Sequence, residues 1–362
     1  MGDIEGLLYD KDFWKLDPLP ITKQRIVSKI RNPRAGKEDL ALAAAYEKGR
    51  IIGYCGIFSD KLFLNGGPQK AGCFTTAWVD PGKRRHGILT QLMGILIKAY
   101  DGRVYVSEMS EPAKKSLDKG GRFTALKPMK FYQVAIRISM MDLLPKRVRL
   151  SRNAAPAISG IEMLCNLPVK TRLNLWKLFN SPDSKFHVEY LAEIDQETGR
   201  FIDKYQKNEL FRRGAAELDW ITRYPWVIQA PFPDVNGSRF FFSSIARSFS
   251  YIKFRILDLN GRIRAFAMLK LRDGHLQVPY AYFDESDRGI VAGVLCHHMV
   301  GLGAKKFETC NARLVGEMKN IKFPIVKISV RDRHTRLSNE LARGADLDAI
   351  SLQDGDGDKV FT

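Results

Sequence analysis

A short basic stretch stands out in the first quarter of the chain. Lys83, Arg84, Arg85 and His86 are consecutive, and Gly87 separates them from an apolar segment with helical spacing. Guanidinium groups suit phosphate oxygens because they offer parallel N–H donors. The first turn of a helix adds unpaired N–H groups, and a glycine lets an anion approach the backbone. The stretch predicts a pyrophosphate-binding turn, although a solvated basic turn capped by Gly87 is the alternative.

The flanking segments must hold this turn in place. Residues 71–79 read as an apolar strand, residues 80–82 as a turn, and residues 88–100 as a helix that ends at Asp101-Gly102. Other phosphate-binding loops are missing from the sequence, because neither a G-x-x-x-x-G-K-[ST] nor a strand-linked G-x-G-x-x-G pattern occurs. The basic turn therefore depends on a strand that leads directly into a helix.

The same order of elements is predicted twice along the chain. In the first half we expect a helix over 21–30, strands over 39–46, 51–58 and 71–79, a helix over 88–100, a strand over 103–107, a short helix over 111–119 and a strand over 131–140; residues 61–64 could extend the second strand. In the second half we expect strands over 252–259, 263–271 and 277–283, a helix over 290–302, a strand over 306–310, a helix over 312–319 and a strand over 325–330. The offset is about 200 residues, and the pattern indicates a topological repeat. Simple α/β alternation would look similar.

Length and composition favour three segments. A chain of 362 residues exceeds one ordinary core. We expect domains over 1–143 and 236–362, joined by a basic helical segment over 144–235. Within it, residues 144–179 carry seven Lys and Arg but one acid, Glu162, and predict short helices over 158–164 and 169–179. On the second of these helices, Trp176 and Lys177 allow contact with an anionic membrane or a lipid-linked substrate, or packing between the halves.

The residues around the basic turn resemble a known signature. Val79, Pro81, Arg84 and Gly87 match the V-x-P-x-x-R/Q-x-x-G-x-G/A motif of the GNAT superfamily, where the fourth strand meets the third helix; Leu89 replaces the final small residue. The motif supports the resemblance over about 20–140, and the order of elements alone supports it over about 240–335. It implies an α/β (α+β) fold with two mixed sheets flanked by helices. The second half should lack the CoA motif, because carboxylates over 284–287 would repel phosphates.

The resemblance implies an enzyme that moves an acyl group, most simply acetyl, from acyl-CoA to an amine. The acceptor could be an amino sugar or another cell-envelope precursor. The residues that it places on acetyl-CoA or another acyl-CoA are Ala77, Trp78, Val79, Arg84, Arg85, His86, Gly87, Ile88 and Leu89.

Catalytic groups are harder to assign. Glu108 ends the strand over 103–107 and is the leading candidate for the base, with a strand-end cap as the plain alternative. Asp80 and His86 are further candidates. The family's short fourth helix often carries a tyrosine that protonates the thiolate; here that helix has none, and Ser116 stands near the expected place.

Charge and composition bound the other functions. The net charge is +18, and residues 1–150 hold 27 Lys and Arg against 15 Asp and Glu. This balance would also suit a Fem-type transferase that uses aminoacyl-tRNA, or a non-catalytic nucleic-acid binder. Nucleic acid is disfavoured because no nucleic-acid-binding motif appears.

No metal site is expected. His297 and His298 are adjacent and diverge on a helix, and the 354–358 repeat of Asp and Gly lacks the glutamate that closes a calcium loop. We therefore expect a solvated acidic tail. Five scattered cysteines and no apolar leader fit a cytoplasmic protein with reduced thiols.

Overall fold

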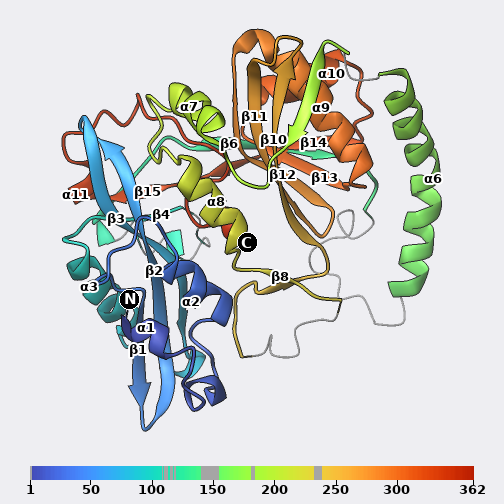
Figure 1. The fold of residues 1–362 in the computed structure, drawn as a ribbon. Coiled ribbons are helices and arrows are strands. Elements are labelled where there is room, and N and C mark those ends of the chain that lie inside the picture. Colours follow the sequence, from blue (N-terminus) through green and yellow to red (C-terminus); the bar gives the residue numbers. More distant parts are fainter. Residues whose placement is uncertain are drawn as a thin grey trace. The chain divides into compact units, whose positions relative to one another are not determined.

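A computed structural model describes residues 2–107, 109, 113–114, 117, 120–139, 155–180, 184–231 and 239–362. These residues form two compact units that are each discontinuous along the chain (Figure 1). Unit 1 contains residues 1–129, 192–249 and 333–362, and unit 2 contains residues 130–191 and 250–332. Each unit is built on a large mixed sheet with helices, as the sequence predicts. The units do not follow the linear division into 1–143, 144–235 and 236–362.

The sheet of unit 1 contains six described strands. They are β1 (Leu42–Glu47), β2 (Arg50–Leu64), β3 (Gly67–Val79), β4 (Val104–Val106), β5 (Phe123–Ala125) and β15 (Arg336–Ser338), and their order across the sheet is β1-β2-β3-β4-β15-β5. β3 and β4 run parallel, and the other neighbours run antiparallel. The strands expected over 39–46, 51–58, 71–79 and 103–107 are present here with shifted ends, whereas β5 was not predicted. Asn65-Gly66 forms the turn between β2 and β3, with both residues at positive φ.

Helices and short strands complete unit 1. They are α1 (Gly2–Gly6), η1 (Phe13–Lys15), α2 (Lys23–Ile30), η2 (Pro81–Lys83), α3 (Ile88–Ala99), α7 (Gln196–Tyr205), α8 (Ala215–Arg223), β8 (Ile228–Gln229), β9 (Ile245–Ala246), α11 (Asn339–Ala342) and η4 (Lys359–Phe361). The inner face of α3 carries Leu92 and Leu96, which pack with Ile57, Phe74 and Val104 of the sheet. This packing fixes the direction in which the chain leaves β3.

The sheet of unit 2 contains seven described strands. They are β6 (Met129–Ala135), β7 (Phe186–Tyr190), β10 (Phe249–Asp258), β11 (Ile263–Arg272), β12 (His275–Phe283), β13 (Lys306–Thr309) and β14 (Lys327–Arg333), in the order β14-β6-β13-β12-β11-β10-β7. The helical elements of this unit are α6 (Ala155–Phe179), η3 (Glu285–Asp287), α9 (Arg288–Gly301) and α10 (Ala312–Asn320). As in unit 1, three consecutive strands lead through a helix to a strand that runs parallel to the third. The predicted repeat is present as topology.

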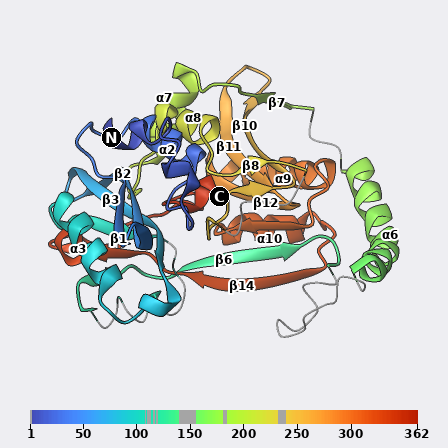
Figure 2. The same ribbon diagram turned by 90° about the horizontal axis from the view of Figure 1, so that it is seen from below.

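Each sheet receives the strand that ends the other half of the chain. β6, which the sequence places at the end of the first half, pairs with β13 and lies beside β14 (Figure 2). Conversely, β15 comes from the end of the chain and pairs with both β4 and β5. Neither half of the sequence could complete its own sheet alone.

Helix α6 differs from the two short helices that the sequence predicts. It runs without a break through Pro168, which normally interrupts a helix because proline lacks an N–H and crowds the preceding turn. Packing holds the helix on both sides of the proline. Before it, the Asn166 side chain donates to the carbonyl oxygens of Glu162 and Ile138, each at 2.7 Å; after it, Trp176 is buried in the core. No described helix is long and apolar enough to cross a bilayer.

The acidic tail is not solvated, so this expectation is wrong. Phe361 is fully buried and stacks on Trp226, with ring centroids 4.6 Å apart. Arg333 donates to the carbonyl oxygens of Asp354 (2.8 Å) and Asp356, which draws the Asp-Gly repeat into unit 1. The prediction rested on the carboxylates alone, whereas Phe361, which follows them, anchors the tail in the core.

If this anchor matters, Phe361→Ala should lower the free energy of unfolding of unit 1 by about 3–5 kcal/mol, because a buried ring is lost and a cavity remains. Chemical denaturation followed by tryptophan fluorescence measures the change, since Trp226 loses its stacking partner. Phe179→Ala is the matched control, because Phe179 is 79% exposed and its loss should have little effect. Equal stabilities for wild type and Phe361→Ala would contradict a structural role for the tail.

Candidate functional site

The basic turn lies between β3 and α3, as predicted. The carboxylate of Asp80 accepts the N–H of Gly82 at 2.8 Å and shapes η2. The Nε of Arg84 donates to the carbonyl oxygen of Val79 at 3.4 Å. Gly87 caps α3 in the left-handed conformation, with φ of +76°. A twelve-residue helix thus begins at the turn, with its first N–H groups unpaired. The left-handed conformation that precedes it is one that glycine adopts most easily.

The side chains of the turn are open to solvent. Arg84, Arg85, His86 and Gly87 are all exposed. Among the described residues neither arginine forms an ion pair, whereas Lys83 is bound to Glu47 at 2.6 Å. A Cβ placed on Gly87 would meet nothing within 4 Å, so the space beside the backbone is open. These features fit a pyrophosphate that would bind to Arg84 and Arg85. Lys83 is already paired with Glu47.

Arg85 adopts φ of +70°, a conformation that costs a non-glycine residue roughly 1–2 kcal/mol. Strain of this kind persists where the surroundings demand it and is common at ligand-binding turns. In the chain, Arg85 stands between the exposed Arg84 and the start of α3.

Strand β3 loses one neighbour just before the turn. Its pairing with β4 extends from Gly72↔Val104 to Phe74↔Val106. From Thr75 to Val79, β2 is the only strand among the described residues that pairs with β3. The β2 register also slips here, because Phe74 pairs with Ile57 and Ala77 with Cys55, which leaves a bulge of two β3 residues. Among the described residues, Ala77, Trp78 and Val79 therefore have a strand partner on one side only, and their backbone N–H and C=O groups on the other side are open to an extended ligand.

An aromatic stack supports this edge. The Trp78 ring stacks on Phe241 with centroids 5.0 Å apart and on Tyr54 with centroids 5.6 Å apart. Tyr54 is buried, and burial raises the pKa of its phenol above the ordinary value. The sequence does not reveal Phe241 or Tyr54 as neighbours of the site, because both reach it through tertiary contacts.

The two predicted catalytic residues, Glu108 and Ser116, lie outside the described residues, so their roles stay predictions. The residue before Glu108 is described: the hydroxyl of Ser107 donates to Asp358 at 2.7 Å and accepts the N–H of Asp358 at 3.2 Å. Gly357 fits against Ser107 with φ of +84°, and a side chain at position 357 would collide with it. The end of the chain thus contributes a carboxylate next to the end of β4.

Two buried ionisable groups near this region have strongly shifted pKa values. Burial, with the neighbouring Glu209, raises the pKa of Asp356 to about 8. Burial also lowers the pKa of Lys29 to about 7, and Arg25 adds to this shift. Burial raises the pKa of Cys73 as well, which keeps this thiol neutral, as expected of a structural cysteine.

Asp356 should make folding stability depend on pH. Its folded pKa is raised above that of the unfolded chain, near 4, so its contribution is fully present below about pH 4 and is lost as the pH rises towards about 8. Between these limits, the free energy of unfolding of Asp356→Asn should rise relative to that of wild type by roughly 1.4 kcal/mol per pH unit. Urea denaturation at pH 5, 6 and 7 tests this, and the exposed Asp348→Asn is the control. A constant difference between wild type and Asp356→Asn over this range would refute the shifted pKa.

The corresponding junction of unit 2 is rich in ion pairs. Asp287 accepts two hydrogen bonds from Arg264, at 2.7 and 3.0 Å. Arg288 bonds to both Glu285 and Glu317. These carboxylates are largely neutralised by arginines, so simple repulsion is a weaker argument against CoA binding than the sequence suggests. Among the described residues, no cluster of side chains could hold a metal ion.

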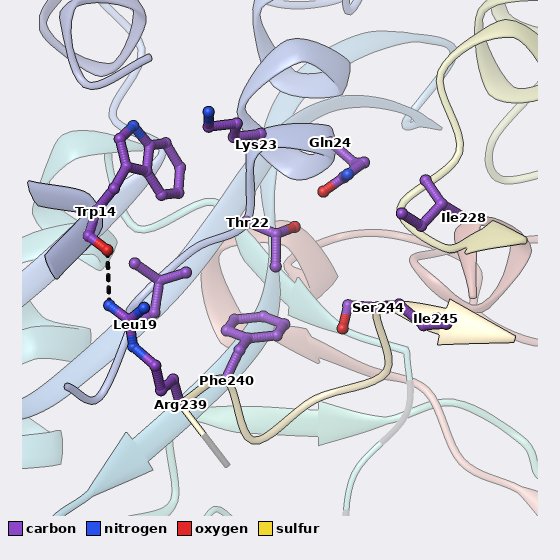
Figure 3. A pocket seen from close by; sticks show the side chains of 10 residues that line it. All are labelled: Trp14, Leu19, Thr22, Lys23, Gln24, Ile228, Arg239, Phe240, Ser244 and Ile245. Carbon is purple, nitrogen blue, oxygen red and sulfur yellow. Dashed lines mark hydrogen bonds between the residues drawn. The ribbon is translucent and has the colours of Figure 1, made fainter. Parts of the chain in front are cut away.

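A cavity of about 340 Å³ lies in unit 1, at the N-terminus of α2 (Figure 3). Aromatic and aliphatic side chains form most of its wall, and Lys23 and Arg239 supply positive charge. The described residues that line it are Trp14, Leu19, Thr22, Lys23, Gln24, Ile228, Arg239, Phe240, Ser244 and Ile245. Arg239 is held by the carbonyl oxygen of Trp14 at 2.7 Å, and the Lys23 ammonium lies 5.1 Å from the Trp14 ring centroid. None of these described lining residues is a carboxylate.

No family model and no curated protein matches the chain. Solved structures are similar in fold. A GCN5-related N-acetyltransferase from Anabaena variabilis matches with 10% identity over 82% of this chain and 62% of its own (TM-score 0.42). A probable N-acyltransferase from Enterococcus faecalis matches with 8% identity over 88% and 66% (TM-score 0.47), and Saccharomyces cerevisiae N-myristoyltransferase with bound myristoyl-CoA matches with 8% identity over 80% and 67% (TM-score 0.43).

The chain spans less than two thirds of the length of the first two of these proteins. At such low identities the likeness concerns the fold alone.

Proposed function

We propose that the protein is an acyl-CoA-dependent N-acyltransferase that binds CoA at the turn between β3 and α3. One observation carries the proposal. Arg84 and Arg85 are exposed, have no acidic partner among the described residues, and lie at the N-terminus of α3 beside the open backbone of Gly87. The N–H groups of Gly87, Ile88 and Leu89 and the two guanidinium groups would bind the pyrophosphate, with His86 at the rim.

The acyl-bearing arm of CoA would continue along the free edge of β3. Ala77, Trp78 and Val79 lie beyond the last β3–β4 pair; they pair with β2 on one side, and the described residues give them no strand partner on the other side. An N–H on this edge would polarise the thioester carbonyl, and such fixed donors stabilise the negative charge that develops on its oxygen.

The reaction needs a neutral amine and a leaving thiolate. The amine nitrogen attacks the carbonyl carbon, the C–S bond breaks, and an amide and free CoA result. Glu108 would accept the proton that the amine loses, and Ser116 would supply the proton that the thiolate gains. Acetyl-CoA is the simplest donor.

The cavity at the N-terminus of α2 is our candidate site for the acceptor. Its described lining contains Lys23 and Arg239 and no carboxylate, so an acceptor that carries only an ammonium group would find no partner among these residues. An amine that also bears a phosphate or carboxylate would fit better, such as an amino-sugar phosphate of the cell envelope. Ring contacts from Phe240 through Phe242 and Tyr54 to Trp78 connect the wall of the cavity with β3.

Charge reversal tests the CoA site. Arg84→Glu would place a carboxylate next to the pyrophosphate, and the two negative charges repel. The Kd for CoA in calorimetry should rise at least tenfold, or about 1.4 kcal/mol. Lys98→Glu makes the same charge change on the same helix, at an exposed position about 15 Å away along the axis, and should leave the affinity nearly unchanged. Equal CoA affinity for wild type and Arg84→Glu would remove the main support for this function.

The base is tested separately. With the most active amine from a screen that follows thiol release from acetyl-CoA, Glu108→Gln should reduce kcat at least a hundredfold and leave the KM for acetyl-CoA within about threefold. The pH–rate profile should also lose its acidic limb. Normal turnover in this variant would shift the assignment to Asp80, His86 or Asp358.

A further inference from the structure

Helix α6 has two apolar faces, and the described residues of unit 2 pack against one of them. Leu173 and Trp176 are buried in the core with residues of α9, such as Cys296 and Val300. The indole N–H of Trp176 donates to the carbonyl oxygen of Ile321 at 3.0 Å. This inner face fixes the helix to the unit, and both views show it at the edge of unit 2, beside α9 (Figures 1 and 2).

The opposite face carries a ridge of large apolar side chains. At 100° per residue, Leu164, Leu167, Leu175 and Leu178 project to the side away from Leu173. Leu164 is 64% exposed and Leu178 is 69% exposed, and Ile161 and Phe179 border the ridge. Single exposed leucines need no explanation, but an aligned set on one helix usually marks a binding surface.

Cations border this ridge on both sides. By the same helical geometry, Lys170 and Lys177 lie along one flank and Arg172 lies along the other, and all three are exposed. The one acid of the described helix, Glu162, lies on the inner side and interacts with Lys305 at 3.4 Å. An apolar stripe with a basic border is the pattern of helices that lie in the headgroup region of an anionic membrane.

We propose that α6 docks unit 2 on an anionic phospholipid bilayer, with the leucine ridge in the interface and the lysines and arginine among the headgroups. Charge argues for a bilayer over a second copy of the chain. A twofold dimer through this face would bring the same cations together, whereas anionic lipid complements them. The inner face already holds the helix in its folded form, so docking would not require the ordering that free amphipathic peptides undergo.

This inference does not depend on acyl transfer. The test is flotation of the full-length protein with vesicles of phosphatidylserine and phosphatidylcholine at about 0.1 M and about 1 M salt. We expect binding at low salt, at least tenfold weaker binding to phosphatidylcholine alone, and loss at high salt. Leu167→Glu with Leu178→Glu should abolish binding. Leu259→Glu is the matched control, because Leu259 is 78% exposed at a turn elsewhere in unit 2, and it should bind like wild type.

Three outcomes would overturn the proposal. Wild-type protein that stays unbound at low salt excludes docking. Binding that survives the double substitution assigns it to general basic charge and not to α6. A dimer in analytical ultracentrifugation that the double substitution dissociates, without vesicle binding, assigns the ridge to a second copy. Thermal unfolding of each variant verifies that the exposed substitutions leave the fold intact.

Discussion

A single buried carboxylate organises unit 1. Asp60 of β2 accepts hydrogen bonds from Arg34 at 2.7 Å, Arg213 at 2.9 Å and the hydroxyl of Tyr105 at 2.6 Å. Burial acts to raise the pKa of Asp60, but the two guanidinium groups outweigh it and hold the pKa below the ordinary value. Tyr105 belongs to β4, and β3 lies between β2 and β4. The cluster therefore links β2 to β4 on either side of β3, next to the β3 residues that lead to the basic turn. Loss of one partner would leave a buried charge without compensation.

The parts of the fold that depend on residues close together in the sequence could be predicted. Strand β3, its turn and α3 follow from apolar spacing and from glycines at positions 82 and 87, and α9 and β13 follow in the same way. Long-range contacts decide the remainder. Nothing local to Pro168 reveals that Ile138 accepts from Asn166 or that Ile321 accepts from Trp176. Likewise, nothing local to the Asp-Gly repeat reveals that Trp226 and Arg333 contact this segment.

The same distinction applies to the candidate site. The geometry of Arg84 to Leu89 could be predicted because a turn and a helix N-terminus are local structures. The neighbours that the prediction missed lie in distant parts of the sequence. Phe241 stacks on Trp78, Glu47 forms a salt bridge with Lys83, and Asp358 accepts a hydrogen bond from Ser107 across 251 positions of sequence. No periodicity or motif relates residues this far apart, so a single sequence contains no signal for them.

The placement of β15 has a consequence for synthesis on the ribosome. β4 and β5 leave the ribosome early, but the strand that lies between them is made roughly 200 residues later, which takes about 10–40 s at typical elongation rates. Throughout that interval the nascent chain has an unfilled gap in its first sheet, and open strand edges invite pairing with other chains. The amino-terminal unit therefore cannot mature ahead of the rest, and a chaperone that shields this gap during translation would protect the chain when it is most prone to aggregate.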